Sequence, residues 1–171
     1  MKKIISLFAL LIFLHLPVVA SFYDPGLTRD IVYFPSEKEP GSIVIITADK
    51  KLYYLLGDDM AYEFPIAVGK TIKDRFYGTF PISRKTKWPA WRPTKNMLKK
   101  NPALPRVVKG GKRNPLGARA LYLGDSAFRI HGTNNPSSIG TAASHGCIRM
   151  YNDDVKELYS ITRVWDTVYV K

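Results

Sequence analysis

The single cysteine of the chain has two histidines close to it in the sequence. Residues 131–149 read HGTNNPSSIGTAASHGCIR, which places His145 two residues and His131 sixteen residues before Cys147. A thiol is a strong nucleophile only when it ionises, and its ordinary pKa of about 8.5 leaves few thiolates at neutral pH. A neighbouring imidazole can accept the thiol proton and later return it to a leaving amine. These residue types therefore predict nucleophilic catalysis by Cys147, with a histidine as the general base.

The spacing of the two histidines does not decide which of them is the base. In an extended chain, His145 and Cys147 lie two residues apart and point to the same side. His131 follows a predicted strand, and the loop after it would have to fold back to bring it to the thiol. The sequence spacing therefore leaves both histidines as candidates for the general base.

The residues beside the cysteine suit an acyl-transfer site. Gly146 lacks a Cβ, so it frees its own φ angle and lets a substrate approach the backbone. The backbone N–H groups around Gly146 and Cys147 could then bind the oxyanion of a tetrahedral intermediate. Arg149 adds a fixed positive charge suited to a substrate carboxylate.

Two other interpretations of these residues remain open. His131, His145 and Cys147 could supply a His2Cys ligand set for zinc. Alternatively, the cysteine is a small buried hydrophobic residue and the histidines have structural partners.

The predicted elements around this stretch are mostly strands. One helix is expected at about 153–161, with Asn152 or Asp153 as its N-cap. Residues 84–117 contain five prolines and many lysines, so we expect a long surface loop with at most a short helix near 95–100. The fold class is therefore mainly β, with a short C-terminal helix and a long basic loop excursion. Strands are expected at 42–47, 52–56, 62–68, 78–83, 118–123, 127–130 and 167–170.

The first twenty residues have the layout of a secretory signal peptide. Two lysines precede an apolar run, and small residues stand at 18 and 20. The apolar run is shorter than the roughly 20 residues that a membrane-spanning helix needs, although an uncleaved anchor is the alternative. We expect export to the periplasm or another extracytoplasmic space. The expected organisation is a signal peptide at 1–20, a lead segment at 21–41 and one catalytic domain at 42–171.

The charge of the chain is unevenly distributed. The formal net charge is +12, and removal of residues 1–20 would leave 12 − 2 = +10. Between Asp74 and Asp125 there are thirteen Lys and Arg and no acidic residue. Such a window indicates a polyanionic partner or a carboxylate-rich substrate. Export argues against nucleic acid and favours a carboxylated wall polymer or an anionic membrane surface. We expect a monomer.

The stretch from His131 to Tyr159 resembles the signature of the L,D-transpeptidases, also called the YkuD domain family. That signature is His-Gly-Thr, a spacer, then Ser-His-Gly-Cys, an apolar residue, Arg and an Asn at a helix start. KWPAWRPT at 87–94 and NPLG at 114–117 look like segments of the enterobacterial ErfK/YbiS-like branch. One segment, DRFYGTFPI at 74–82, keeps Gly78 and Phe80 but lacks the Thr-Pro turn that often precedes them in the family. The matching residues are His131, Gly132, Thr133, Ser144, His145, Gly146, Cys147, Ile148, Arg149 and Asn152.

The resemblance implies a β-sandwich or barrel, peptidoglycan stem peptides as substrate, and no cofactor or metal. It implies Cys147 as the nucleophile and His131 as its base. The acyl acceptor would be an amine of another stem peptide, giving a 3-3 crosslink, or of an outer-membrane lipoprotein. The alternatives are an L,D-carboxypeptidase or endopeptidase that hydrolyses the same bond, and a wall-binding module without catalysis. Residues implied to support the site or the oxyanion are Ser144, His145, Gly146, Gly132 and Thr133, and those implied to bind substrate are Arg149, Asn152 and Trp91.

Overall fold

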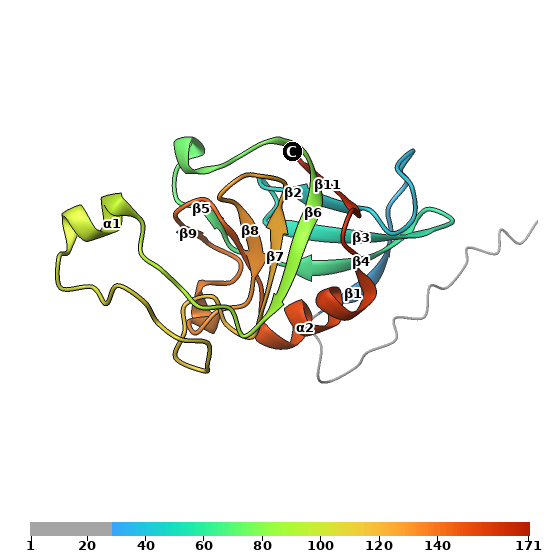
Figure 1. Cartoon of the computed structure of the whole chain (residues 1–171). Helices are drawn as coiled ribbons and strands as arrows, with labels where there is room; N and C mark the ends of the chain where they lie inside the picture. The colour runs from blue at the N-terminus through green and yellow to red at the C-terminus, as the bar shows by residue number, and fades with distance from the viewer. Residues whose placement is uncertain (1–28) are drawn as a thin grey trace, which may run out of the picture.

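The computed structural model describes residues 29–171, in which one large β-sheet forms the body of the domain (Figure 1). The predicted signal peptide at 1–20 lies outside the described residues. A second sheet pairs β5 (Val68–Gly69) with β9 (Ala142–Ser144). The large sheet has the strand order β1-β4-β3-β2-β11-β6-β7-β8-β10. Its strands are β1 (Asp30–Tyr33), β2 (Ile43–Ile46), β3 (Lys51–Gly57), β4 (Met60–Pro65), β6 (Gly78–Lys87), β7 (Arg119–Leu123), β8 (Arg129–His131), β10 (Ile148–Arg149) and β11 (Thr167–Val170).

Strand β6 joins the two halves of the large sheet. Its first residues, from Gly78 to Pro81, pair with β11, and its later residues, from Ile82 to Lys87, pair with β7. The register shifts between Ile82 and Arg84, as in a β-bulge, which bends a strand. Buried side chains of both halves belong to one hydrophobic core. The predicted mainly β fold is confirmed, with one sheet continuous through β6 supplying both halves.

The predicted strands are confirmed, with changes at their ends. Strand β6 continues four residues beyond the predicted end at residue 83, because Arg84 to Lys87 pair with β7. Lys85 is held there by hydrogen bonds to the carbonyls of Tyr159 and Thr162. The prediction that residues 84–87 belong to the surface loop was therefore wrong. Strands β1, β9 and β10 were not predicted, since two to four residues carry too short an alternation pattern to detect. The single strand predicted at 62–68 is divided between β4 and β5.

The two predicted helices are present as α1 (Lys95–Lys100) and α2 (Asn152–Ile161). Short 3-10 turns occupy Ile72–Asp74 and Pro136–Ser138. Among residues 29–171 no helix has the length and apolar character needed to cross a bilayer.

The predicted cap of α2 was wrong. The N-cap residue is Tyr151, and no side chain caps the helix. Asn152 instead uses its amide to join two distant backbone segments: Oδ1 accepts from the Ala118 N–H at 2.9 Å, and Nδ2 donates to the Thr133 carbonyl at 2.8 Å. The side chain that looked like a helix cap therefore holds the chain around β7 and β8 in place.

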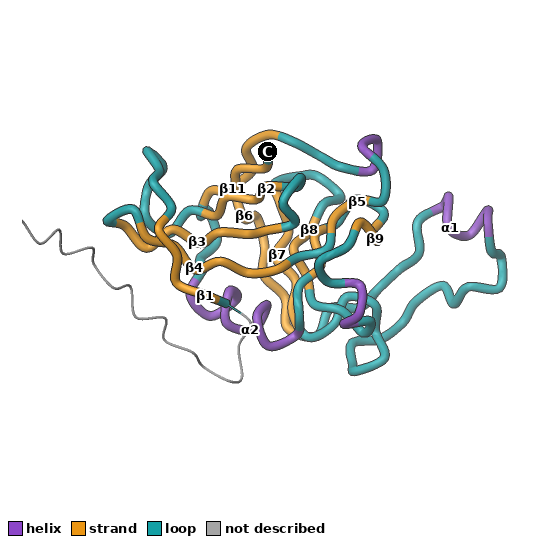
Figure 2. Tube along the Cα trace, turned by 180° about the vertical axis from the view of Figure 1, so that it is seen from behind, coloured by secondary structure: helices purple, strands orange, loops and turns teal. Residues whose placement is uncertain are grey.

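The loop between β6 and β7, residues 88–117, leaves the body of the domain and carries α1 at its outer part (Figures 1 and 2). We call it the excursion. At its base, Trp91 and Val108 exchange two backbone hydrogen bonds of 2.9 Å. Asn114, only 1% exposed, lies beside them. Its Nδ2 lies within 3.0 Å of the carbonyls of Pro89, Val108 and Lys109, and its Oδ1 accepts from the Leu116 N–H. The base of the excursion is thus closed around one buried amide.

Replacement of Asn114 by alanine should therefore destabilise the domain. Buried carbonyls left without a donor cost about 1–3 kcal/mol, and we expect a loss of that size in the free energy of unfolding, measured with urea. The matched control is Asn96→Ala, at an exposed position on α1, which should change little. Equal unfolding midpoints for the two variants would show that Asn114 does not hold the base.

Candidate active site

Cys147 lies in a cleft of about 210 Å³ between the body of the domain and the excursion. The excursion supplies one wall, which includes Trp91 and Arg92. The predicted substrate-binding residues Trp91 and Arg149 thus lie on different walls of one cleft. The body contributes Ala127, Phe128, Arg129, His131, Ser144, His145, Cys147 and Arg149 to the lining.

The parallel pairing of β8 with β10 brings the site residues together. Ile148 pairs with Ile130, and Arg149 pairs with His131. The two isoleucines are buried in the main core. Because successive side chains of a strand point to opposite faces, His131 and Arg149 lie on the other face, toward the cleft. Residues far apart in sequence become neighbours through this short ladder.

The His131 ring is held neutral and in a fixed orientation. It is 4% exposed, and its Nδ1 lies 2.5 Å from the carbonyl oxygen of Gly132. A carbonyl only accepts hydrogen bonds, so Nδ1 carries the proton and Nε2 is left as the acceptor. Burial lowers the pKa of His131 from 6.5 to about 4, with the charges of Arg149 and Arg129 adding to the effect and the Gly132 hydrogen bond opposing it.

Cys147 starts as a neutral thiol in this cleft. Burial raises its pKa, while the charge and N–H groups of Arg129, and then the charge of Arg149, oppose the rise. Its Sγ lies 3.9 Å from the Ala127 carbonyl oxygen. Burial thus favours the uncharged form of both groups. Deprotonation of the thiol would therefore need a neutral proton acceptor, and His131 lines the same cleft.

His145 lies at the same cleft but in a different environment. Its side chain is exposed. Asp74 lies near enough for the His145 charge to contribute to a lowered pKa of that carboxyl, after the hydrogen bonds from Thr71. Sequence spacing left the choice of base open; burial and a fixed tautomer favour His131 over His145.

Ser144 and Gly146 shape the turn that leads to Cys147. The buried Ser144 hydroxyl accepts from the Gly146 N–H at 3.0 Å. This N–H is therefore occupied, and the neighbouring amides of His145 and Cys147 are the better candidates for an oxyanion site. Gly146 has φ +120°, and a Cβ there would lie 3.1 Å from the Asp74 carbonyl oxygen and 3.2 Å from the Phe128 ring. Only glycine suits this turn.

Gly132, Thr133 and Asn152 do not line the cleft but lie behind His131. A Cβ on Gly132 would come within 2.2 Å of the Asn152 Oδ1, so the glycine permits this close approach. The Asn152 amide is engaged by Ala118 and by Thr133. These contacts position the loop after His131. A role of Asn152 in substrate binding stays a prediction.

Sequence reasoning missed Arg129. It stands two residues before His131 on β8 and therefore faces the same side, which is the signal that could have identified it.

The zinc interpretation finds no support in the geometry: in the described part of the chain, no three His, Cys, Asp or Glu side chains form a group that could hold a metal.

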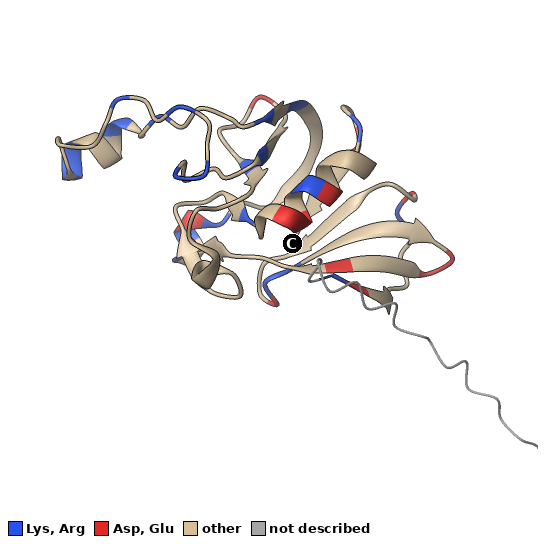
Figure 3. Cartoon of the chain, turned by 90° about the horizontal axis from the view of Figure 1, so that it is seen from below, with Lys and Arg blue, Asp and Glu red and all other residues tan. Residues whose placement is uncertain are grey.

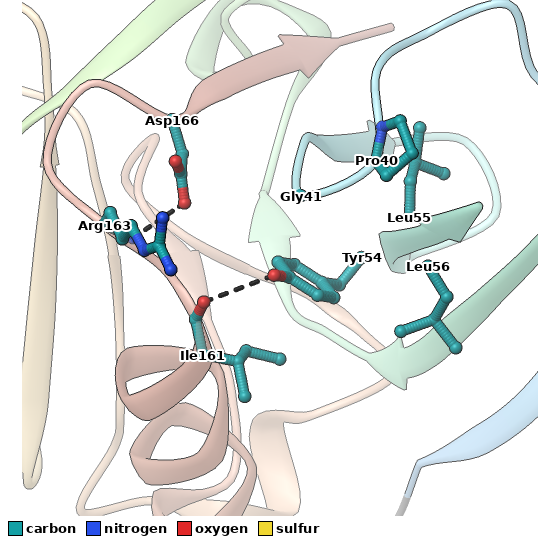
Figure 4. Close-up of a pocket in the computed structure, with 8 residues that line it drawn as sticks. All are labelled: Pro40, Gly41, Tyr54, Leu55, Leu56, Ile161, Arg163 and Asp166. Carbon is teal, nitrogen blue, oxygen red and sulfur yellow. Dashed lines mark hydrogen bonds between the residues drawn. The ribbon is translucent and has the colours of Figure 1, made fainter.

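A second hollow, of about 360 Å³, is lined by residues of β3 and of the turn after α2 (Figure 4). The Tyr54 hydroxyl donates to the Ile161 carbonyl oxygen at 3.2 Å, and the Arg163 N–H donates to Asp166 at 2.6 Å. These bonds tie the end of α2 to the sheet and to β11. The hollow shares no lining residue with the Cys147 cleft.

The lowered pKa of His131 predicts a pH dependence of stability. Between about pH 4 and 6.5 the unfolded chain binds more protons at this residue than the folded chain does. Stability is therefore full above pH 6.5 and falls by up to about 3 kcal/mol as the pH drops to 4. Urea unfolding at pH 7 and pH 4.5 should show this loss in the wild type and in His145→Gln. His131→Gln should lose clearly less free energy of unfolding between these two pH values. An equal loss in this variant would contradict the assignment of the pH dependence to His131.

Comparisons with known proteins identify the family of the chain. The family model for the L,D-transpeptidase catalytic domain, YkuD, matches residues 40–170. A probable L,D-transpeptidase of Escherichia coli, YbiS, is 41% identical over 123 residues, which are 68% of this chain and 40% of YbiS. The chain thus spans well under half the length of this relative. The match supports the predicted resemblance to the enterobacterial ErfK/YbiS-like branch.

Solved structures share the fold. The catalytic domain of the E. faecium L,D-transpeptidase is 19% identical, covers 80% of this chain and all of that domain, and has a TM-score of 0.59. A Brucella melitensis protein described as a probable carnitine operon oxidoreductase is 41% identical, covers 82% of this chain and 91% of that one, and has a TM-score of 0.57. With the family model covering residues 40–170, this chain belongs to the family of L,D-transpeptidase catalytic domains.

Proposed function

We propose that this domain is an L,D-transpeptidase that acts on peptidoglycan stem peptides in the cell wall, outside the cytoplasm. The observation that supports this best is one cleft holding the Cys147 thiol and a buried, neutral His131 with a fixed tautomer. A signal peptide at residues 1–20 and a periplasmic location are part of the proposal. The redox description of the Brucella protein concerns that protein, and nothing in the described cleft favours it over acyl transfer.

The reaction begins with a tetrapeptide stem in the cleft. The Cys147 proton passes to Nε2 of His131 while the sulfur attacks the carbonyl between the L-centre of diaminopimelate and the terminal D-Ala. Backbone N–H groups at His145 and Cys147 bind the resulting oxyanion. The C–N bond then breaks, and His131 returns the proton to the departing D-Ala amine. A thioester remains on Cys147.

The second half transfers the acyl group. An acceptor amine attacks the thioester, His131 takes its proton, and the thiol leaves. The acceptor is an amine of another stem peptide or of a lipoprotein. Arg149 lies beside His131 on the cleft face and binds a stem carboxylate. Trp91 on the opposite wall packs against the peptide.

The decisive experiment incubates the purified protein with a disaccharide-tetrapeptide and identifies the products by mass spectrometry. A transpeptidase releases D-Ala and forms a dimer, or joins the stem to an added amine. A tripeptide as the sole product would identify an L,D-carboxypeptidase. Cys147→Ala is the control: it should retain the fold by circular dichroism and form no product. Normal turnover in this variant would overturn the proposal.

The two histidines should differ in their effect on acylation. His131→Ala should lose nearly all reaction of Cys147 with a carbapenem β-lactam, about 10²-fold or more, because the general base is lost. His145→Ala removes an exposed side chain and should keep part of the rate. The rate of mass increase on the protein measures both. If His145→Ala is not acylated while His131→Ala still reacts, the roles of the two histidines are the reverse of those proposed.

The excursion should attract the anionic wall. Lys and Arg recur along it, and it carries no Asp or Glu (Figure 3). Surface charges act over about 10 Å at 0.1 M salt, so binding to isolated sacculi should weaken as salt rises. Reversing Lys95, Lys99 and Lys100 together should weaken it further at low salt.

The matched control for the excursion reverses Lys38, Arg163 and Lys171, which are exposed and outside the cleft lining. Both triple variants carry the same net charge. If the two bind sacculi equally well, the excursion has no special part in wall affinity. Reaction with a small uncharged acylating agent should be nearly unchanged in both.

A further inference from the structure

Arg129 stands beside the nucleophile without an acidic partner. It lines the Cys147 cleft, and no Asp or Glu is among the lining residues. No described ion pair includes it. Its Nε is buried and has no hydrogen-bond acceptor among the described residues. A buried donor without a partner costs free energy, so its retention calls for a functional reason.

The strand pairing fixes where this charge lies. Arg129 is opposite Tyr122 on β7, and its guanidinium carbon lies 5.1 Å from the centroid of that ring. On the other side, Cys147 directly precedes Ile148, which pairs with Ile130 on β8. The arginine therefore extends from the same short ladder that carries the cysteine and the base. Its position follows from the sheet and not from a mobile loop.

The Cys147 thiol is the neighbouring group whose ionised form a positive charge would stabilise. Burial opposes ionisation of Cys147, and among the groups that counteract it Arg129 contributes most. Interactions between charges are stronger in such a partly buried cleft than in water. The sulfur becomes negative as its proton leaves, so a fixed cation beside it lowers the cost of that step.

We propose that Arg129 stabilises the thiolate of Cys147 as the proton moves to His131, and so sets the reactivity of the nucleophile before any substrate binds. The proposal rests on Cys147 being the nucleophile of the proposed function. It separates the two arginines of this face: Arg129 serves the sulfur, whereas Arg149 is left for a substrate carboxylate.

Several charged and titratable groups face Cys147 and must be held constant in a test. They come from β8, β10, the turn before β10, the 3-10 turn at Ile72–Asp74 and the excursion. The groups that line the cleft are Arg129, His131, Arg149, His145 and Arg92, and Asp74 lies near His145 without lining the cleft.

The test measures alkylation of Cys147 by iodoacetamide from pH 5 to pH 10. This small neutral reagent needs only the thiolate. In Arg129→Met the midpoint of the rate profile should move to higher pH, and the rate at pH 7 should fall about tenfold for each unit of that movement. Arg129→Lys keeps a charge and should recover part of the rate.

The matched control is Arg84→Met. Arg84 lies over the same Tyr122 ring, at 3.7 Å from the ring centroid, but extends from β6, which lies on the opposite side of β7 from β8. If Arg129 acts only through packing on Tyr122, both variants will behave alike and the proposal fails. Thermal unfolding identifies any variant that does not fold, in which case Arg129→Gln replaces Arg129→Met.

Two further outcomes separate this inference from the proposed function. An unchanged alkylation profile, with lower kcat/KM only for stem peptides that end in a free carboxylate, would assign Arg129 to substrate binding and overturn the inference. A shifted profile in a protein that neither crosslinks nor hydrolyses stem peptides would support the inference while the proposed function fails.

Discussion

The ladder between β8 and β10 is the contact on which the site depends. It is only two residue pairs long, and it joins strands separated by sixteen residues, which include the short strand β9. Ile130 and Ile148 bury their side chains in the main core on one face. Their burial fixes the register, because a slip of one residue would turn these side chains to the other face. With the register fixed, His131, Arg149 and the adjacent Cys147 must meet at the cleft.

The electrostatics of the cleft follow from this placement. Burial keeps both the imidazole and the thiol uncharged at neutral pH. A neutral thiol and a neutral imidazole are stable in a partly dry site, and Arg129 and Arg149 would favour a negative charge on the sulfur. The Gly132 carbonyl prevents the ring from presenting its protonated nitrogen to the sulfur. The same burial that keeps the imidazole neutral also makes the fold sensitive to acid.

The excursion gives the cleft its second wall. Its base is closed by the Trp91–Val108 bridge and by the Asn114 amide, so its inner residues return to the same place although the loop is long. Its outer part carries basic side chains on α1 and around it (Figure 3). One segment thus combines a rigid contact near the thiol with a charged surface farther out. That arrangement suits a polymeric anionic substrate, in which one peptide enters the cleft and the rest remains outside.

Local sequence patterns determined much of this protein by themselves. Alternating or continuous apolar runs identified the long strands, and the Ser144–Cys147 motif identified the family, because periodicity and motif spacing are local properties. The tertiary structure alone decided what depends on distant contacts. It favours His131 over His145 as the base through burial and the Gly132 hydrogen bond, and it placed Arg129 at the thiol. It also turned Asn152 from an apparent helix cap into a link between Ala118 and Thr133, since a side-chain amide bonds to whichever backbone groups the packed chain brings within reach.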